Sequence, residues 1–315
     1  YKNRGSGLAD LRSGIEINSA VFTKASVNGF FTEYGQGLVG HENDFEGPVK
    51  GVAESGGLSV INHPGDWLES YVDVNHAHEK KNVELFADIL KKYSSCLGIE
   101  AFNRIDTVTC ADRILWDELL SAVIPSGRNV WGFANSDAHV LSDIDTSFMD
   151  FVLPDRTEQT VRRGMENGTF FSVGRRAAYE LGKDFVGEGE YPTVTRITAN
   201  EDEQSISIEG KNYNRVQWIS NGKIIAEGIL TPGTGGVALR RDAHQRFAAQ
   251  FPFDQNFDDP GGSPYHAFPD LIEHTAGIAP FHAEVSPVFA AAPDADAENR
   301  TEFLSAQIVP HLPLH

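Results

Sequence analysis

The sequence predicts an α/β fold over residues 1–187, arranged as a (β/α) barrel, followed by a small all-β domain over residues 188–315. Three observations support this division. Short apolar runs alternate with helical patterns in the first part. Ligand-type side chains follow several of the apolar runs. The second part has short strands separated by turns and lacks helical periodicity.

Short apolar or alternating runs mark seven predicted strands, at residues 13–18, 27–34, 58–63, 97–103, 130–134, 147–153 and 169–173. Helical spacing predicts helices at residues 48–54, 79–93, 114–120 and 157–168. Strands that alternate with helices in this way indicate parallel βαβ units. A barrel is favoured over an open sheet because it brings every strand end to one mouth.

After Gly187 the pattern changes to short strands at residues 193–199, 205–209, 216–220 and 223–226. The Asn221-Gly222 pair predicts a tight hairpin turn. These features indicate an antiparallel sandwich. Residues 231–300 are rich in Pro, Gly, Ala and Asp and predict a long irregular segment, after which residues 302–309 form a closing strand.

The composition is acidic, with 26 Lys plus Arg against 45 Asp plus Glu and a net charge of −19. Such a surface repels nucleic-acid phosphate and anionic lipid, so neither is an expected partner. A small anionic substrate would need local help from a metal or a few arginines. Arg175, which follows the last predicted barrel strand, is a candidate for binding such an anion at the mouth.

Two cysteines, Cys96 and Cys110, are too few for a disulfide framework or a cysteine-rich zinc site. No apolar run approaches the roughly 20 residues that span a bilayer. The compartment stays open between the cytoplasm and export. Tyr1 is not Met and no signal-peptide pattern follows it, so we expect the natural chain to continue upstream.

Asp137 and His139 follow the apolar run at residues 130–134 and stand two residues apart. On an extended chain both side chains point to one side, at the carboxyl end of a buried strand. A carboxylate and an imidazole together there suggest a metal site. A turn aspartate beside an exposed histidine is the alternative.

Three other strands contribute residues of the same kind: Glu16, His63, and Glu100 with Asn103. Glu16 lies between two isoleucines, and a buried carboxylate needs a cation. Acid and imidazole ligands suit zinc, manganese or iron better than calcium. We therefore expect divalent transition metal ions at one barrel mouth.

The four segments GIEIN (14–18), INHPG (61–65), GIEAFN (98–103) and NSDAH (135–139) resemble successive motifs of the PHP (polymerase and histidinol phosphatase) superfamily. The resemblance covers roughly residues 10–185. It implies a distorted (β/α)7 barrel that binds two or three divalent transition metal ions, and it implies phosphoesterase activity. It also implies that Glu16 bridges two metals and that His63, Asp137 and His139 are metal ligands. Glu100 and Asn103 match a position that lines the site.

The family opens with a His-x-His pair and then an Asp-His pair, and neither precedes Glu16 here. We expect these two motifs to lie upstream of Tyr1. The leading interpretation is a metal-dependent hydrolase that cleaves a phosphate ester through an activated water, with Glu16, Asp137 and His139 as catalytic residues and Glu100, Asn103 and Arg175 binding substrate. Hydrolysis of a carboxylic ester, amide or carbamate is an alternative, as is a non-catalytic binding protein with a degraded metal site.

Overall fold

The computed structural model describes residues 11, 13–18, 25–35, 44–185, 193–200, 205–211, 215–220, 223–229, 237–240, 282–285 and 305–309. The predicted irregular segment at residues 231–300 lies mostly outside these residues, which include only two short strands of it. No helix in the described ranges is long and apolar enough to cross a membrane.

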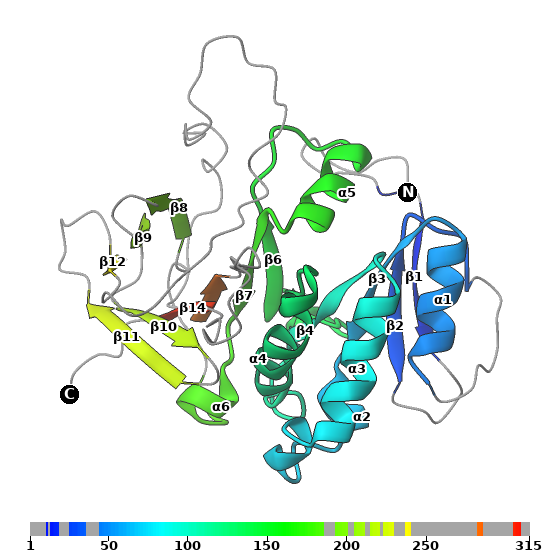
Figure 1. The fold of residues 1–315 in the computed structure, drawn as a ribbon, viewed down its shortest axis with the longest axis horizontal. Coiled ribbons are helices and arrows are strands. Elements are labelled where there is room, and N and C mark those ends of the chain that lie inside the picture. The colour runs from blue at the N-terminus through cyan, green and yellow to red at the C-terminus, as the bar shows by residue number, and fades with distance from the viewer. Residues whose placement is uncertain are drawn as a thin grey trace, which may run out of the picture.

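Five strands form a mixed sheet in the order β1-β2-β3-β4-β5 (Figure 1). Their bounds are β1 Gly14–Asn18, β2 Ser26–Phe30, β3 Leu58–Asn62, β4 Cys96–Asn103 and β5 Trp131–Asn135. Each of the first five predicted strands therefore has a counterpart. The last three pair in parallel, which places their carboxyl ends at one edge of the sheet.

The expectation of parallel units throughout is wrong for the first strands. Both the β1–β2 and the β2–β3 pairs are antiparallel. The connection over residues 19–25 is shorter than the dozen or more residues that a parallel crossover needs. The closed barrel stays a prediction, because the described strands here form a five-stranded sheet.

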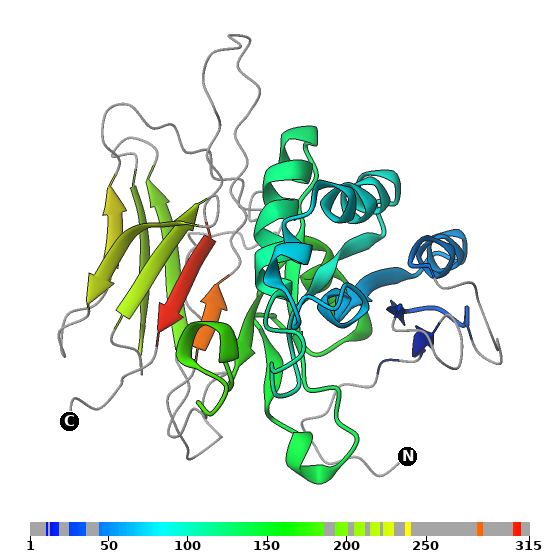
Figure 2. The ribbon, with the colours of Figure 1, turned by 90° about the horizontal axis from the view of Figure 1, so that it is seen from below.

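Helices cover one face of this sheet, as Figures 1 and 2 show for α1, α3 and α4. The α-helices are α1 Glu46–Glu54, α2 Pro64–Trp67, α3 Lys80–Lys92, α4 Asp112–Val123, α5 Glu158–Asn167 and α6 Ala178–Leu181. Short 3-10 helices lie at η1 Val74–Ala77, η2 Ile124–Ser126 and η3 Leu141–Asp143. The predicted apolar face of α3 is buried: Phe86 and Leu90 are inaccessible to solvent. Burial of such faces against the sheet forms the main core.

A second, antiparallel sheet has the order β11-β10-β14-β13-β7-β6. Its strands are β6 Ser147–Phe151, β7 Phe170–Gly174, β10 Arg215–Ser220, β11 Lys223–Ile229, β13 His282–Val285 and β14 Ser305–Val309. Figure 2 shows the orange β13 and the red β14 side by side. Because β13 pairs with β7, this sheet crosses the predicted boundary at residue 187.

Two details of this sheet bear on the predictions. The pair β6–β7 is antiparallel, which corrects the expected parallel βαβ unit around α5. The closing strand expected at residues 302–309 is present as β14, between β10 and β13. A third, smaller sheet has the order β12-β9-β8, formed by β8 Thr193–Asn200, β9 Ser205–Lys211 and β12 Val237–Arg240, and is also antiparallel.

Candidate functional site

The candidate site lies where the parallel strands β3, β4 and β5 end. Immediately beyond these strands, His63, Arg104 and Asp137 have positive φ angles of 28°, 46° and 44°. This backbone region is unfavourable for residues other than glycine and is concentrated at functional sites. The sheet therefore turns sharply at three neighbouring strand ends, each of which presents a charged or titratable side chain.

Glu100 holds the three strand ends together from inside the sheet. Its buried carboxylate accepts hydrogen bonds from the His63 backbone N–H (2.8 Å), the Asn103 amide (3.0 Å) and the Asn135 amide (2.5 Å). Burial raises the pKa of Glu100, although these donors and the nearby His63 act in the opposite direction. Glu100 is thus placed to orient its neighbours, and its oxygens are already engaged.

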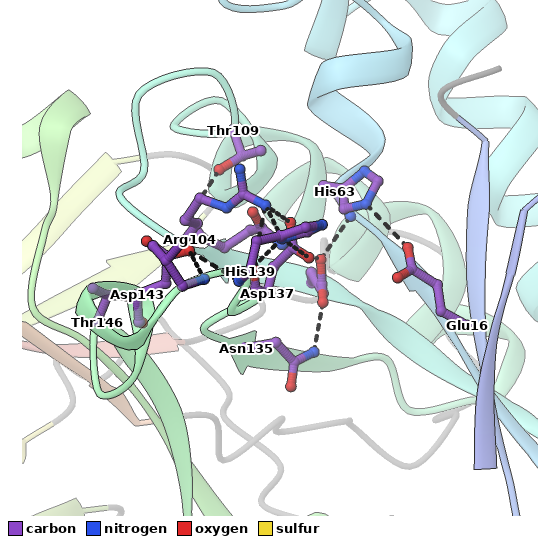
Figure 3. A network of polar contacts seen from close by, with 12 residues as sticks. Glu16, His63, Arg104, Thr109, Asn135, Asp137, His139, Asp143 and Thr146 are labelled. Carbon is purple, nitrogen blue, oxygen red and sulfur yellow. Dashed lines mark hydrogen bonds and ion pairs between the residues drawn. The ribbon is translucent and has the colours of Figure 1, made fainter. Parts of the chain in front are cut away.

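Glu16 on β1 and His63 after β3 form the first of two acid–imidazole pairs. Their Oε1 and Nε2 atoms are 3.5 Å apart. The pair lies at the right of Figure 3. Burial alone would lower the pKa of His63, but the hydrogen bond to Glu16 and the charges of Glu100, Glu16 and Asp112 raise it to about 9. The same hydrogen bond lowers the pKa of Glu16. Within the described residues, the buried Nδ1 of His63 has no hydrogen-bond partner.

Asp137 and His139 form the second pair, and Arg104 lies between them (Figure 3). The Asp137 Oδ1 and His139 Nδ1 atoms are 3.5 Å apart. The Arg104 Nη2 group donates to the Asp137 carboxylate at 2.8 Å and to its backbone carbonyl at 3.1 Å, and lies 2.5 Å from His139 Nδ1. The predicted convergence of Asp137 and His139 is present, and in this structure the cation beside Asp137 is a guanidinium.

The four predicted metal ligands thus lie as two pairs, Glu16 with His63 and Asp137 with His139. In the part of the chain that the structure describes, no group of three or more His, Cys, Asp or Glu side chains is close enough to hold a metal ion. The donor types are those that zinc, manganese or iron would use. Their spacing here is that of two separate ion pairs.

Arg175, predicted to lie at the mouth, follows β7 and reaches the loop after β5. Its guanidinium binds Asp145 at 2.5 Å, and its backbone N–H donates to the Thr146 carbonyl. The last strand of the predicted barrel therefore does end beside the Asp137 loop. Its arginine is engaged in an ion pair there.

The sequence patterns did not identify two residues that contribute to the site, Arg104 and Asp112. Arg104 follows the predicted strand at residues 97–103 without forming part of a recognisable motif, yet it binds Asp137. Asp112 on α4 is fully buried and accepts the Gly65 N–H at 2.5 Å, which fixes the turn after His63. Burial raises the pKa of Asp112 well above its usual range. The sequence gives little indication that Asp112 is buried at the site, because an acidic residue in the first turn of a helix is ordinarily exposed.

Other polar features of the described chain are structural. A hollow of about 440 Å³ lies at the opposite, amino-terminal ends of the strands and is lined by residues that include Leu58, Leu97, Arg128 and Trp131. The Arg128 guanidinium there donates to four backbone carbonyls, at Leu90, Tyr93, Ser94 and Cys96. Because its donors are taken up by the backbone, Arg128 is a clamp between elements.

Comparisons of this chain with protein-family models, with curated proteins and with solved structures found no match. The functional interpretation therefore rests on the residues and their geometry.

Proposed function

We propose that this chain is a metal-dependent hydrolase of the PHP type that cleaves a phosphate ester. The observation that carries the proposal is the placement of two acid–imidazole pairs, Glu16 with His63 and Asp137 with His139, beside the ends of the parallel strands β3, β4 and β5. Glu16 and Asp137 are 121 positions apart in the chain, and His63 lies between them in sequence. Glu16 contacts His63, and the Glu100 carboxylate accepts hydrogen bonds from the His63 backbone and from Asn135, two residues before Asp137. Strand ends of this kind are where α/β folds place their chemistry.

The donor set suits two or three divalent ions such as zinc, manganese or iron. Glu16 with His63 would hold one side of such a centre, and Asp137 with His139 the other. A bound ion would supply Lewis acidity toward the phosphoryl oxygens and lower the pKa of water. The His63 Nδ1 atom, which has no hydrogen-bond partner in the described structure, is a further nitrogen available to coordinate a metal ion.

The side chains around this centre have distinct roles in the proposal. Arg104 and Arg175 bind the negatively charged phosphoryl group, because guanidinium groups match its oxygen pairs. His139, whose side chain is 69% exposed, is accessible to donate a proton to the leaving oxygen. Glu100 and Asn103, expected from the sequence to contact substrate, are buried and bonded to each other, which favours a role in positioning His63 and Asn135.

Arg104 favours a phosphate over a neutral ester among possible substrates, since it places a positive charge at the candidate centre. Hydrolysis of a carboxylic ester, amide or carbamate would use the same acid and imidazole groups. The paired spacing of the donors in the described residues would instead suit a non-catalytic binding protein.

Metal analysis combined with turnover of a generic aryl phosphate tests the proposal. The protein should bind two or three equivalents of transition metal and hydrolyse the phosphate. Glu16→Gln and Asp137→Asn should each lower the metal content. Each should also reduce the rate of phosphate hydrolysis at least about 100-fold. Glu118→Gln is the matched control, because Glu118 forms a carboxylate–imidazole pair with His78 at 2.7 Å on the surface.

The three outcomes separate the candidate functions. Metal with phosphatase activity, both lost in the site variants and retained in Glu118→Gln, supports the proposal. Metal with esterase or amidase turnover alone identifies the alternative hydrolase. Absence of both metal and turnover overturns the hydrolase assignment and leaves a binding protein.

A further inference from the structure

Three large aliphatic side chains are exposed directly after the candidate site residue His139. Val140, Leu141 and Ile144 are 60%, 86% and 58% exposed. Single exposed apolar residues are ordinary on protein surfaces. Three within five residues occur nowhere else among the described residues, and a concentration of this kind marks a binding surface.

The loop that carries these side chains is firmly held. The Asp143 carboxylate accepts the backbone N–H groups of His139 (2.9 Å) and Val140 (3.1 Å). The Thr146 hydroxyl donates to the Asp143 carbonyl at 2.7 Å. The turn therefore presents its aliphatic side chains outward in a fixed conformation, which lowers the entropic cost of binding a ligand.

This loop is tied to the loop after β4, which carries a fourth exposed aliphatic residue, Val108. Arg104 connects the two loops: its guanidinium binds Asp137, and its backbone carbonyl accepts from the Ser147 hydroxyl at 3.3 Å. Figure 3 shows Asp143 and Thr146 beside Arg104 and His139. We define the apolar rim as Val140, Leu141 and Ile144. It follows His139 on the loop that Arg104, the proposed phosphate-binding arginine, contacts through Asp137.

We propose that the apolar rim binds the organic part of the substrate, so that the preferred substrate is a phosphate monoester with an extended apolar group. The inference rests on the proposed function and adds the substrate class. A phosphate group held by Arg104 places the ester's organic group beside the loop after His139. The rim then removes part of that group from water.

A second copy of the chain fits the rim less well than a substrate does. A stable protein interface buries about 1,200–2,000 Å² in total, far more than three side chains supply. Two copies of a chain with a net charge of −19 also repel each other. A small apolar group matches both the size and the position of the rim.

Hydrolysis of 4-methylphenyl and 4-butylphenyl phosphate tests the inference, because the two leaving groups have nearly the same acidity. Each fully buried methylene favours binding about fourfold, so partial cover by the rim should give the butyl ester at least about a tenfold higher kcat/KM. Leu141→Ser should abolish this preference. Ile224→Ser, which alters an exposed aliphatic residue on β11, should retain the preference.

Equal kcat/KM values for the two esters, or a preference that survives Leu141→Ser, overturn the inference and leave the proposed function intact. Absence of turnover with both esters overturns the proposed function. In that event calorimetric binding of 4-butylphenyl and 4-methylphenyl phosphonate decides the inference, and equal affinities overturn it. A dimer that Leu141→Ser converts to a monomer would assign the rim to self-association and also overturn it.

Discussion

The Glu100 carboxylate accepts a hydrogen bond from the backbone N–H of His63 at 2.8 Å. This contact joins the carboxyl end of β4 to the strained residue after β3, whose φ is 28°. The charge of Glu100 also helps to raise the pKa of His63. Glu100 therefore fixes the backbone that carries the imidazole and, after the hydrogen bond to Glu16, contributes to keeping it protonated.

Replacing Glu100 with glutamine should lower the pKa of His63 from its value of about 9, because the substitution removes a nearby negative charge and retains the side-chain shape. An NMR titration of the histidine ring protons measures the change. Glu118→Gln should leave the His63 titration unaltered, since Glu118 pairs with His78. An unchanged His63 titration in Glu100→Gln would contradict the assigned electrostatic role.

The stability of the metal-free protein should fall as the pH rises from about 6.5 through about 9. The pKa of His63 is raised from 6.5 to about 9 in the folded state, chiefly by Glu16 against the effect of burial. Its stabilising contribution is therefore complete below the unfolded-state pKa and is lost above the folded-state pKa. The loss should be on the order of 2–3 kcal/mol.

Urea unfolding in the presence of a chelator at pH 6 and at pH 9.5 measures this loss. The variant His63→Gln should show a flatter dependence over the same window. A wild-type stability that rises across the window would refute the assigned His63–Glu16 interaction.

Arg113→Met should destabilise the fold by about 3–5 kcal/mol. The Arg113 guanidinium is buried and makes paired hydrogen bonds to Asp106 (3.0 and 2.9 Å) and to Glu180 (2.6 Å each). Removal of the guanidinium leaves the buried Asp106 carboxylate without its cation. Unfolding measured by circular dichroism tests the value.

The matched control for this change is Arg162→Met. Arg162 pairs with Glu166 at 3.0 Å on the surface of α5, where solvent screens the charges. Its loss should cost less than about 1 kcal/mol. Equal losses for the two variants would show that the Arg113 cluster does not hold α6 to the loop after β4.

Gly65→Ala should destabilise the fold by about 1–3 kcal/mol, the usual range for overpacking. A Cβ atom at Gly65 would lie 2.1 Å from Asp112 Oδ1, which is buried and cannot move aside easily. Gly47→Ala provides the comparison, because the added methyl meets only the Asp44 carboxylate at 3.2 Å. Chemical unfolding of both variants measures the difference, and equal stabilities would contradict the close approach of Asp112.

The sequence located the strands of the first sheet and the polar residues at their ends. The apolar runs before Asn62 and Asn135 are nearly continuous, and both strands are buried. Such runs are recognisable locally because the strands are covered on both faces. The order of Glu16, His63, Glu100 and Asp137 along the chain also came from local patterns alone.

Strand direction and sheet membership were decided by tertiary structure. Alternation of strands and helices does not reveal that β6 and β7 are antiparallel and continue into β13, because hydrogen bonds between distant segments set that pairing. The seven-stranded barrel, predicted from the resemblance, stays a prediction.

The sequence by itself determined which residue types stand at the strand ends, since periodicity is a property of neighbouring residues. Only the tertiary structure decided their partners: Arg104 binds Asp137, and Glu100 accepts from both His63 and Asn135. These partners are 33 to 37 residues apart in the chain. Burial gives such contacts their strength, because a charge removed from water must find its counterpart wherever the fold places it.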